Sequence, residues 1–103
     1  MAKKIVAGVT VDVTEEGYLV DATVWTKAIA IDIAQEEGVE LSDRHFALLD
    51  FLRDKYKKGE NLTIRSIGQS EIVDIKGFYQ LFPGAPMKKA AKIAGIPKPA
   101  SCI

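Results

Sequence analysis

Hydrophobic and polar positions alternate near the start of the chain. From residue 9 to residue 13 every odd position is valine, and the positions between are threonine and aspartate. A period of two in β-branched residues predicts a half-buried strand. Residues 14–17 have turn chemistry, with a glycine at position 17, and residues 18–20 predict a second short strand. The beginning of the chain therefore predicts an antiparallel hairpin.

After residue 20 the apolar positions recur mostly at spacings of three and four, which predicts helices. Asp21 is the expected N-cap of the first helix, which contains Trp25 and ends before Gly38. Ser42 caps the second helix and Gly59 ends it. The polar side of this second helix is formed by Arg53, Asp54, Lys57 and Lys58.

Three shorter helices follow in the pattern. Thr63 is a candidate cap for one, and Asp74 begins another that runs to Phe82. Pro86 suits the first turn of a last helix, which Gly95 closes. We therefore expect an α+β fold, with a small N-terminal antiparallel β-hairpin or meander packed on an array of about five short helices.

The last eight residues, 96–103, differ in character because prolines occupy positions 97 and 99. Proline stops a helix and cannot donate to a sheet, and it biases the preceding residue to an extended conformation. We expect one domain over residues 1–95 and a flexible, extended C-terminal arm over residues 96–103. Eight extended residues reach roughly 26 Å.

The composition limits the class of protein. The 103 residues include a single cysteine, which excludes an internal disulfide and suits a reducing compartment. No apolar run approaches the roughly 20 residues that cross a bilayer, and no signal peptide opens the chain. We therefore expect a cytoplasmic protein that does not associate with membranes.

The 14 basic and 14 acidic residues cancel, but they are unevenly placed. Residues 1–75 hold 9 basic and 14 acidic side chains, a balance of −5, whereas the remainder holds five lysines and no acid. These are Lys76, Lys88, Lys89, Lys92 and Lys98. A basic C-terminal quarter favours an anionic partner, and the alternative is an ordinary solvated face.

Several kinds of site are absent from the sequence. It has no phosphate-binding glycine motif, and one His with one Cys does not make a structural zinc site, so we expect no cofactor and no metal. His45, in the first turn of the second helix, is interpreted as a capping or packing residue. Asp32, Glu36 and Glu37 are interpreted as a solvated helix face, and Trp25 as a core residue.

Cys102 is the candidate reactive residue because it is the penultimate residue of a proline-stiffened arm. A structural cysteine is normally buried, whereas a terminal one offers an accessible sulfur. Lys98 favours the thiolate, and the carboxylate of Ile103 disfavours it, so activation is expected from a partner. The alternative is an incidental terminal cysteine.

Residues 81–103 read LFPGAPMKKAAKIAGIPKPASCI. This segment resembles the C-terminus of the DsrC/TusE family of sulfur-relay proteins, which includes the gamma subunit of dissimilatory sulfite reductase. Trp25, His45 and the segments 16–19 and 51–54 are similar to the family as well. The resemblance implies a small β-meander against helices and a flexible C-terminal arm.

The resemblance also implies a function, in which Cys102 carries sulfane sulfur as a persulfide between a donor protein and an acceptor protein. The lysines expected to help dock these partners are Lys88, Lys89, Lys92 and Lys98. Some members carry a second arm cysteine, and the corresponding residue here is Ala91. This favours a one-thiol relay, as in the branch that serves 2-thiouridine formation in tRNA, and a sulfurtransferase only in the sense of a covalent carrier.

Two alternatives remain open from the sequence. One is a partner or regulator of a sulfite reductase complex, similar to its gamma subunit. The other is a helix-turn-helix-like module formed by residues 63–69 and 74–82. Direct nucleic-acid binding is disfavoured, because that region offers only Arg65, Gln69 and Gln80 for base contacts.

Overall fold

In the computed structural model, which describes residues 2–60 and 63–97, two strands precede a short 3-10 helix and five α-helices. The strands are β1 (Ala2–Val6) and β2 (Val9–Val13), and the 3-10 helix is η1 (Ala22–Val24). The α-helices are α1 (Lys27–Glu36), α2 (Asp43–Lys57), α3 (Ile64–Gly68), α4 (Ile75–Leu81) and α5 (Pro86–Ile93). The α+β prediction is confirmed.

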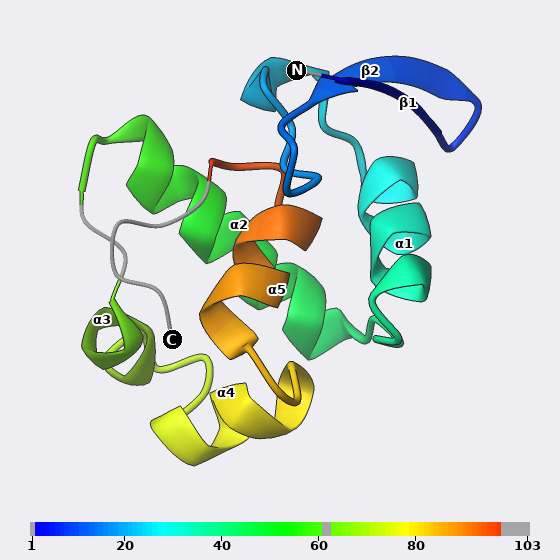
Figure 1. Ribbon diagram of the computed structural model, residues 1–103. Coiled ribbons are helices and arrows are strands. Elements are labelled where there is room, and N and C mark those ends of the chain that lie inside the picture. The colour runs from blue at the N-terminus through cyan, green and yellow to red at the C-terminus, as the bar shows by residue number, and fades with distance from the viewer. Residues whose placement is uncertain (1, 61–62, 98–103) are drawn as a thin grey trace.

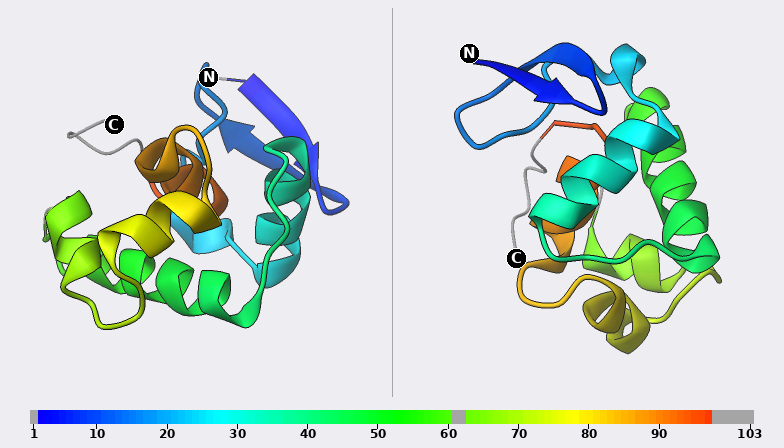
Figure 2. Two further views of the ribbon diagram at one scale, coloured as in Figure 1. Left: turned by 90° about the horizontal axis from the view of Figure 1, so that it is seen from below. Right: turned by 90° about the vertical axis from the view of Figure 1, so that its right-hand side faces the viewer.

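The last helix occupies the middle of the molecule (Figure 1). Helix α5 contacts α1, α2 and α4, and the β1–β2 hairpin lies at the end of the molecule opposite to α4 (Figures 1 and 2). Helices α3 and α4 pack against each other. None of the helices in the described ranges is long and apolar enough to cross a membrane.

The N-terminal hairpin differs from the expected one. Strands β1 and β2 pair antiparallel, with Val6 opposite Val9, around a turn at Ala7 and Gly8 that has φ values of 51° and 78°. Positive φ at both central residues is typical of a tight hairpin turn. The sequence pattern does not predict β1, because its residues lack clear alternation and alanine is an unusual residue for the first position of such a turn.

The segment predicted as the second strand, residues 18–20, makes only an isolated bridge between Leu19 and Val13. The N–H of Val20 also donates to the carbonyl oxygen of Asp12 at 3.0 Å. The N-terminal part is therefore a three-segment meander, in which the third segment is short.

The first predicted helix is in fact two elements. Asp21 is an N-cap, as expected, but of the short η1, where its side chain accepts from the N–H of Thr23. Helix α1 begins later, and its cap is Thr26, whose Oγ1 accepts from the N–H of Ile29 at 3.2 Å. Trp25 lies between the two helices in extended backbone and not within a helix.

The other helix boundaries are as predicted. Ser42, Thr63 and Asp74 are the N-caps of α2, α3 and α4, and Pro86 is in the first turn of α5. Local capping chemistry therefore determines most of the boundaries.

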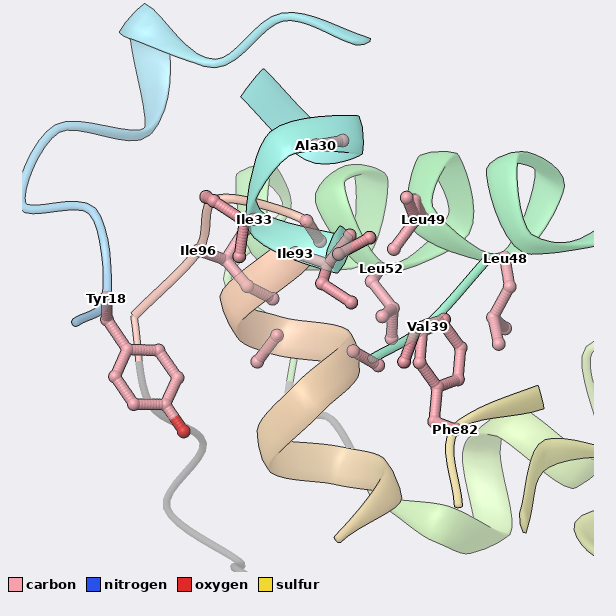
Figure 3. Close-up of a cluster of buried hydrophobic side chains, with 14 of the residues drawn as sticks. Tyr18, Ala30, Ile33, Val39, Leu48, Leu49, Leu52, Phe82, Ile93 and Ile96 are labelled. Carbon is pink, nitrogen blue, oxygen red and sulfur yellow. The ribbon is translucent and has the colours of Figure 1, made fainter. Parts of the chain in front are cut away.

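The core forms where α1, α2 and α5 meet (Figure 3). Ile33, Leu52 and Ile93 come from these three helices, and each is at most 3% exposed. Ile96, the first residue of the expected arm, is also in the core at 1% exposure, and its N–H donates to the carbonyl oxygen of Ala91 at 3.2 Å. The rest of the expected arm from residue 98 lies outside the described residues.

Candidate functional site

Two of the predicted site residues, Lys98 and Cys102, lie outside the described residues. The described residues end at Pro97, so they include only the support of the expected arm. This support is the C-terminal end of α5 together with the segments that contact it. Among the residues described, no group of three or more His, Cys, Asp or Glu side chains could hold a metal ion.

Helix α5 is strongly amphipathic, and its apolar face is fixed in the core. The buried positions are Pro86, Met87, Ala90, Ala91 and Ile93. Ala91 is 1% exposed. By the resemblance, Ala91 corresponds to the second arm cysteine of some members, and here that position holds a buried methyl group. The sequence has a single cysteine, so Cys102 has no intramolecular disulfide partner.

The three α5 lysines have different environments. Lys88 is exposed and Lys89 is half-buried. Lys92 points toward the end of α1, where its Nζ lies 2.7 Å from Oε1 of Glu37. The charge of Lys92 is therefore paired within the fold, and Lys88 and Lys89 are the stronger docking candidates on this helix.

The three clustered carboxylates of α1 and its C-cap each bind a different partner. Oδ2 of Asp32 accepts from the N–H of Ala7 at 2.7 Å and so holds the hairpin turn. Glu36 pairs with Lys4, and Glu37 with Lys92. These residues are therefore not a simple solvated face, as the sequence suggested, but tie the hairpin and α5 to α1.

His45 is a structural residue, as predicted. The residue is 6% exposed, Nδ1 accepts from the N–H of Ser42 at 3.0 Å, and Nε2 lies 2.9 Å from the carbonyl oxygen of Leu81. This pattern fits a neutral imidazole that carries its proton on Nε2. The ring also makes an edge contact with Phe82 at a centroid distance of 5.1 Å. Both nitrogens are used, so His45 joins α2 to α4 and is not a free catalytic base.

The environment of Arg53 differs from the prediction. The helical pattern places this residue on the polar face of α2, but it is half-buried, and its guanidinium donates to two carbonyl oxygens. Nη1 reaches Ala94 and Nη2 reaches Ala22, each at 2.9 Å. The acceptors are 41 and 31 residues away in sequence, so no local pattern could have revealed them.

Trp25 contacts both the end of α5 and the guanidinium of Arg53. Its Nε1–H donates to the carbonyl oxygen of Ile93 at 2.8 Å, and the guanidinium carbon of Arg53 lies 4.4 Å from the centroid of its ring. A guanidinium stacked on an indole is a favourable cation–π geometry. Burial lowers the pKa of Arg53, and the nearby carboxylate of Asp50 opposes that shift. The side chain remains a cation at neutral pH.

Gly95 packs closely against the ring of Trp25. Its φ is +70°, and a Cβ at this position would lie 2.4 Å from Cδ1 of Trp25. Only glycine suits this place, because it has no side chain and adopts positive φ without strain. We call Trp25, Arg53 and Gly95 the arm clasp.

Comparison with known proteins gives a consistent result. Residues 5–103 match the family model described as DsrC like protein. The sulfurtransferase TusE of Salmonella typhimurium is 38% identical, with 96% of this chain and 98% of the relative covered. The fold is similar to that of Allochromatium vinosum DsrC, solved by NMR, with a TM-score of 0.83, 32% identity and coverage of 98% and 97%.

A further solved structure is the oxidised gamma-subunit of the dissimilatory sulfite reductase (DsrC) from Archaeoglobus fulgidus. It has a TM-score of 0.82 and 28% identity, and the match covers 99% of this chain and 100% of the other. The resemblance found in the sequence is thereby confirmed over almost the full length. The chain belongs to the family of DsrC-like proteins.

Proposed function

We propose that this protein is a sulfur carrier that holds sulfane sulfur as a persulfide on Cys102. The observation that carries the proposal is the match to the DsrC-like family through residue 103, which includes the penultimate cysteine. The curated relatives that match along most of the chain are named sulfurtransferase TusE.

The proposed loading step is an exchange of one sulfur atom. The thiolate of Cys102 attacks the terminal sulfur of a persulfide on the donor protein, and a new S–S bond forms at Cys102. The old S–S bond breaks, and its electron pair leaves with the donor cysteine as a thiolate. The terminal sulfur keeps its proton, and no net oxidation occurs. Unloading is the same step with an acceptor thiolate as the attacking group.

A one-thiol carrier fits the position of Ala91. With no second cysteine in the chain, the loaded sulfur cannot be displaced by an internal thiol, and it must wait for a partner. The chain can therefore store and pass on sulfur but cannot release it by closing a disulfide on itself.

Docking is assigned to the basic C-terminal part. On α5, Lys88 is exposed and Lys89 is half-buried. Lys98 and Cys102 follow later in the sequence, in the expected arm. Exposed lysines favour an acidic partner surface and speed the encounter. Lys92 contributes less to this surface, because it is paired with Glu37. We place the protein in the cytoplasm, which suits a persistent free thiol.

The preferred pathway is thiolation of tRNA to give 2-thiouridine, because the relatives at 35–38% identity are named TusE. The second candidate is a partner of a sulfite reductase complex, which the similarity to solved gamma-subunits favours. Ala91 argues against the redox form of that second role.

The pathway is tested in Escherichia coli from which the TusE gene has been deleted. Expression of this protein should restore 2-thiouridine in tRNA, as measured by mass spectrometry of nucleosides, and Cys102→Ser should not restore it. The E. coli TusE gene is the positive control. If the wild-type protein is expressed and 2-thiouridine stays absent, the tRNA pathway is wrong and the sulfite reductase candidate takes its place.

A further inference from the structure

We propose that Trp25 and Arg53 are positioning residues for sulfur transfer. By donating hydrogen bonds to the end of α5, they fix the position of Ile96 and Pro97, where the described part of the chain ends. The inference rests on the proposed carrier function. It states that two residues far from Cys102 in sequence increase the rate of sulfur transfer.

The clasp satisfies carbonyl groups that the helix itself leaves without donors. The last carbonyls of a helix have no intrahelical partner. The carbonyl of Ile93 would accept from residue 97 in a continuing helix, but Pro97 has no N–H. The indole of Trp25 supplies the missing donor, and Arg53 supplies one for Ala94. A cation is also favoured at this negative end of the helix dipole.

The clasp also joins three segments that are distant in sequence. Trp25 comes from the loop between η1 and α1, and Arg53 comes from α2. Both donate hydrogen bonds to carbonyl oxygens at the end of α5. Arg53 also donates to the carbonyl oxygen of Ala22 in η1, so the same guanidinium connects α2 both to η1 and to the end of α5. The guanidinium carbon of Arg53 lies 4.4 Å from the centroid of the Trp25 ring, and this contact fixes the two side chains relative to each other.

The chain that leaves the clasp has little freedom at its root. Gly95 is in contact with Trp25, and Ile96 is 1% exposed in the core (Figure 3). Pro97 follows with a fixed φ near −65°. The root of the arm is thus set by packing and by proline chemistry up to the end of the described chain.

A fixed root matters because the remaining chain is short. Cys102 is five residues beyond Pro97, and five extended residues span at most about 17 Å. With the root fixed, the thiol of a docked carrier searches a small volume near the partner's site, which raises its effective concentration there. If the root loosens, the same thiol searches a larger volume and transfer slows.

The test compares Arg53→Gln and Trp25→Phe with the matched control Arg44→Gln. Arg44 is exposed on the same helix and away from the clasp. Sulfur transfer is measured from a persulfide-loaded cysteine desulfurase, and alkylation of Cys102 by iodoacetamide is measured beside it. We expect transfer to fall about tenfold in both clasp variants, since small misplacements of reacting groups are costly. Alkylation should be unchanged in all proteins, because the small reagent needs no positioning, and transfer should be unchanged in the control.

Trp25→Phe keeps an aromatic ring at this position, removes the N–H donor and makes the ring smaller. It leaves Arg53 in place, so the test does not depend on how well Arg53→Gln folds. Arg53→Lys should recover part of the rate, because it retains the charge but not the planar fork. Thermal unfolding of every variant shows whether it is folded at the assay temperature.

A second readout needs no sulfur chemistry. A spin label on Cys102 and another at Ala47→Cys, an exposed position on α2, report the distance distribution between the arm and the body. We expect the distribution to broaden in both clasp variants. If folded Arg53→Gln and Trp25→Phe transfer sulfur at the wild-type rate, or slow transfer without a change in the distribution, the proposal is wrong. If the wild-type protein accepts no sulfur at all, the carrier function fails, and the distances alone decide whether the clasp positions the arm.

Discussion

The ammonium group of Lys92 lies 2.7 Å from the carboxylate of Glu37, and the two side chains are only 23% and 24% exposed. This ion pair joins α5 to the C-cap of α1. The aliphatic end of Lys92 also covers Gly17, where a Cβ would lie 2.8 Å from Cε. One of the four lysines expected to serve docking is thus a structural residue as well.

Replacing Lys92 by methionine should therefore lower the free energy of unfolding by about 1 kcal/mol, because it leaves a partly buried carboxylate without its partner. Lys88→Met, at an exposed position of the same helix, should change it by less than about 0.5 kcal/mol. Urea denaturation measures both. Equal losses in the two variants would show that the ion pair contributes nothing specific.

Association with a partner should depend on the more exposed lysines, Lys88 and Lys89, and less on Lys92. The double variant Lys88→Glu with Lys89→Glu should slow association with the sulfur-donor protein, and the effect should shrink as salt is added, because the lysines act through long-range attraction. Association rates at two salt concentrations test this. A charge-matched control, Lys3→Glu with Arg44→Glu, changes the net charge equally at sites outside α5. If the control slows association as much, net charge rather than an α5 docking surface is responsible.

Gly95→Ala should lower the free energy of unfolding by more than Gly59→Ala. Both glycines have φ near +70°, so each substitution costs roughly 1 kcal/mol in backbone strain. At Gly59 a Cβ meets nothing within 4 Å, whereas at Gly95 it overlaps the ring of Trp25. The overlap should add about 1–3 kcal/mol. Thermal or urea unfolding gives the difference, and similar losses at the two sites would contradict the close contact.

His45→Ala should destabilise the protein more than His45→Gln. Alanine removes the bonds to Ser42 and Leu81 together with the edge contact to Phe82, and we expect a loss of about 2–4 kcal/mol. Glutamine at this third position of the helix still reaches the backbone N–H of Ser42, as in an ordinary capping box. Its loss should be smaller by at least about 1 kcal/mol. Losses of the same size would mean that the cap contributes little and that packing accounts for the effect.

Much of the helical part could be predicted because its signals are local. The side chains of Thr63 and Asp74 accept from backbone N–H groups three residues later, and at Ser42 the ring of His45 accepts from the backbone N–H. The sequence around each cap therefore contains the whole interaction. The C-terminal motif and the penultimate cysteine likewise lie in one continuous segment. The family could therefore be recognised from the sequence alone.

The features that the sequence did not predict depend on contacts between distant segments. Arg53 looks solvated by helical periodicity, and only the positions of Ala22 and Ala94 in space explain why it is half-buried. Glu37 and Lys92 are 55 residues apart, and Asp32 caps a hairpin turn 25 residues before it. Strand β1 was missed because its pairing with β2, rather than its own residue pattern, makes it a strand.

The central claim, that Cys102 carries sulfane sulfur, is tested most directly by the intact mass of the protein after incubation with a cysteine desulfurase and free cysteine. We expect a gain of one sulfur atom in the wild-type chain and no gain in Cys102→Ala. Cyanide, which removes sulfane sulfur as thiocyanate, should return the wild-type mass to its starting value. An unchanged wild-type mass, or the same gain in Cys102→Ala, would contradict the carrier function.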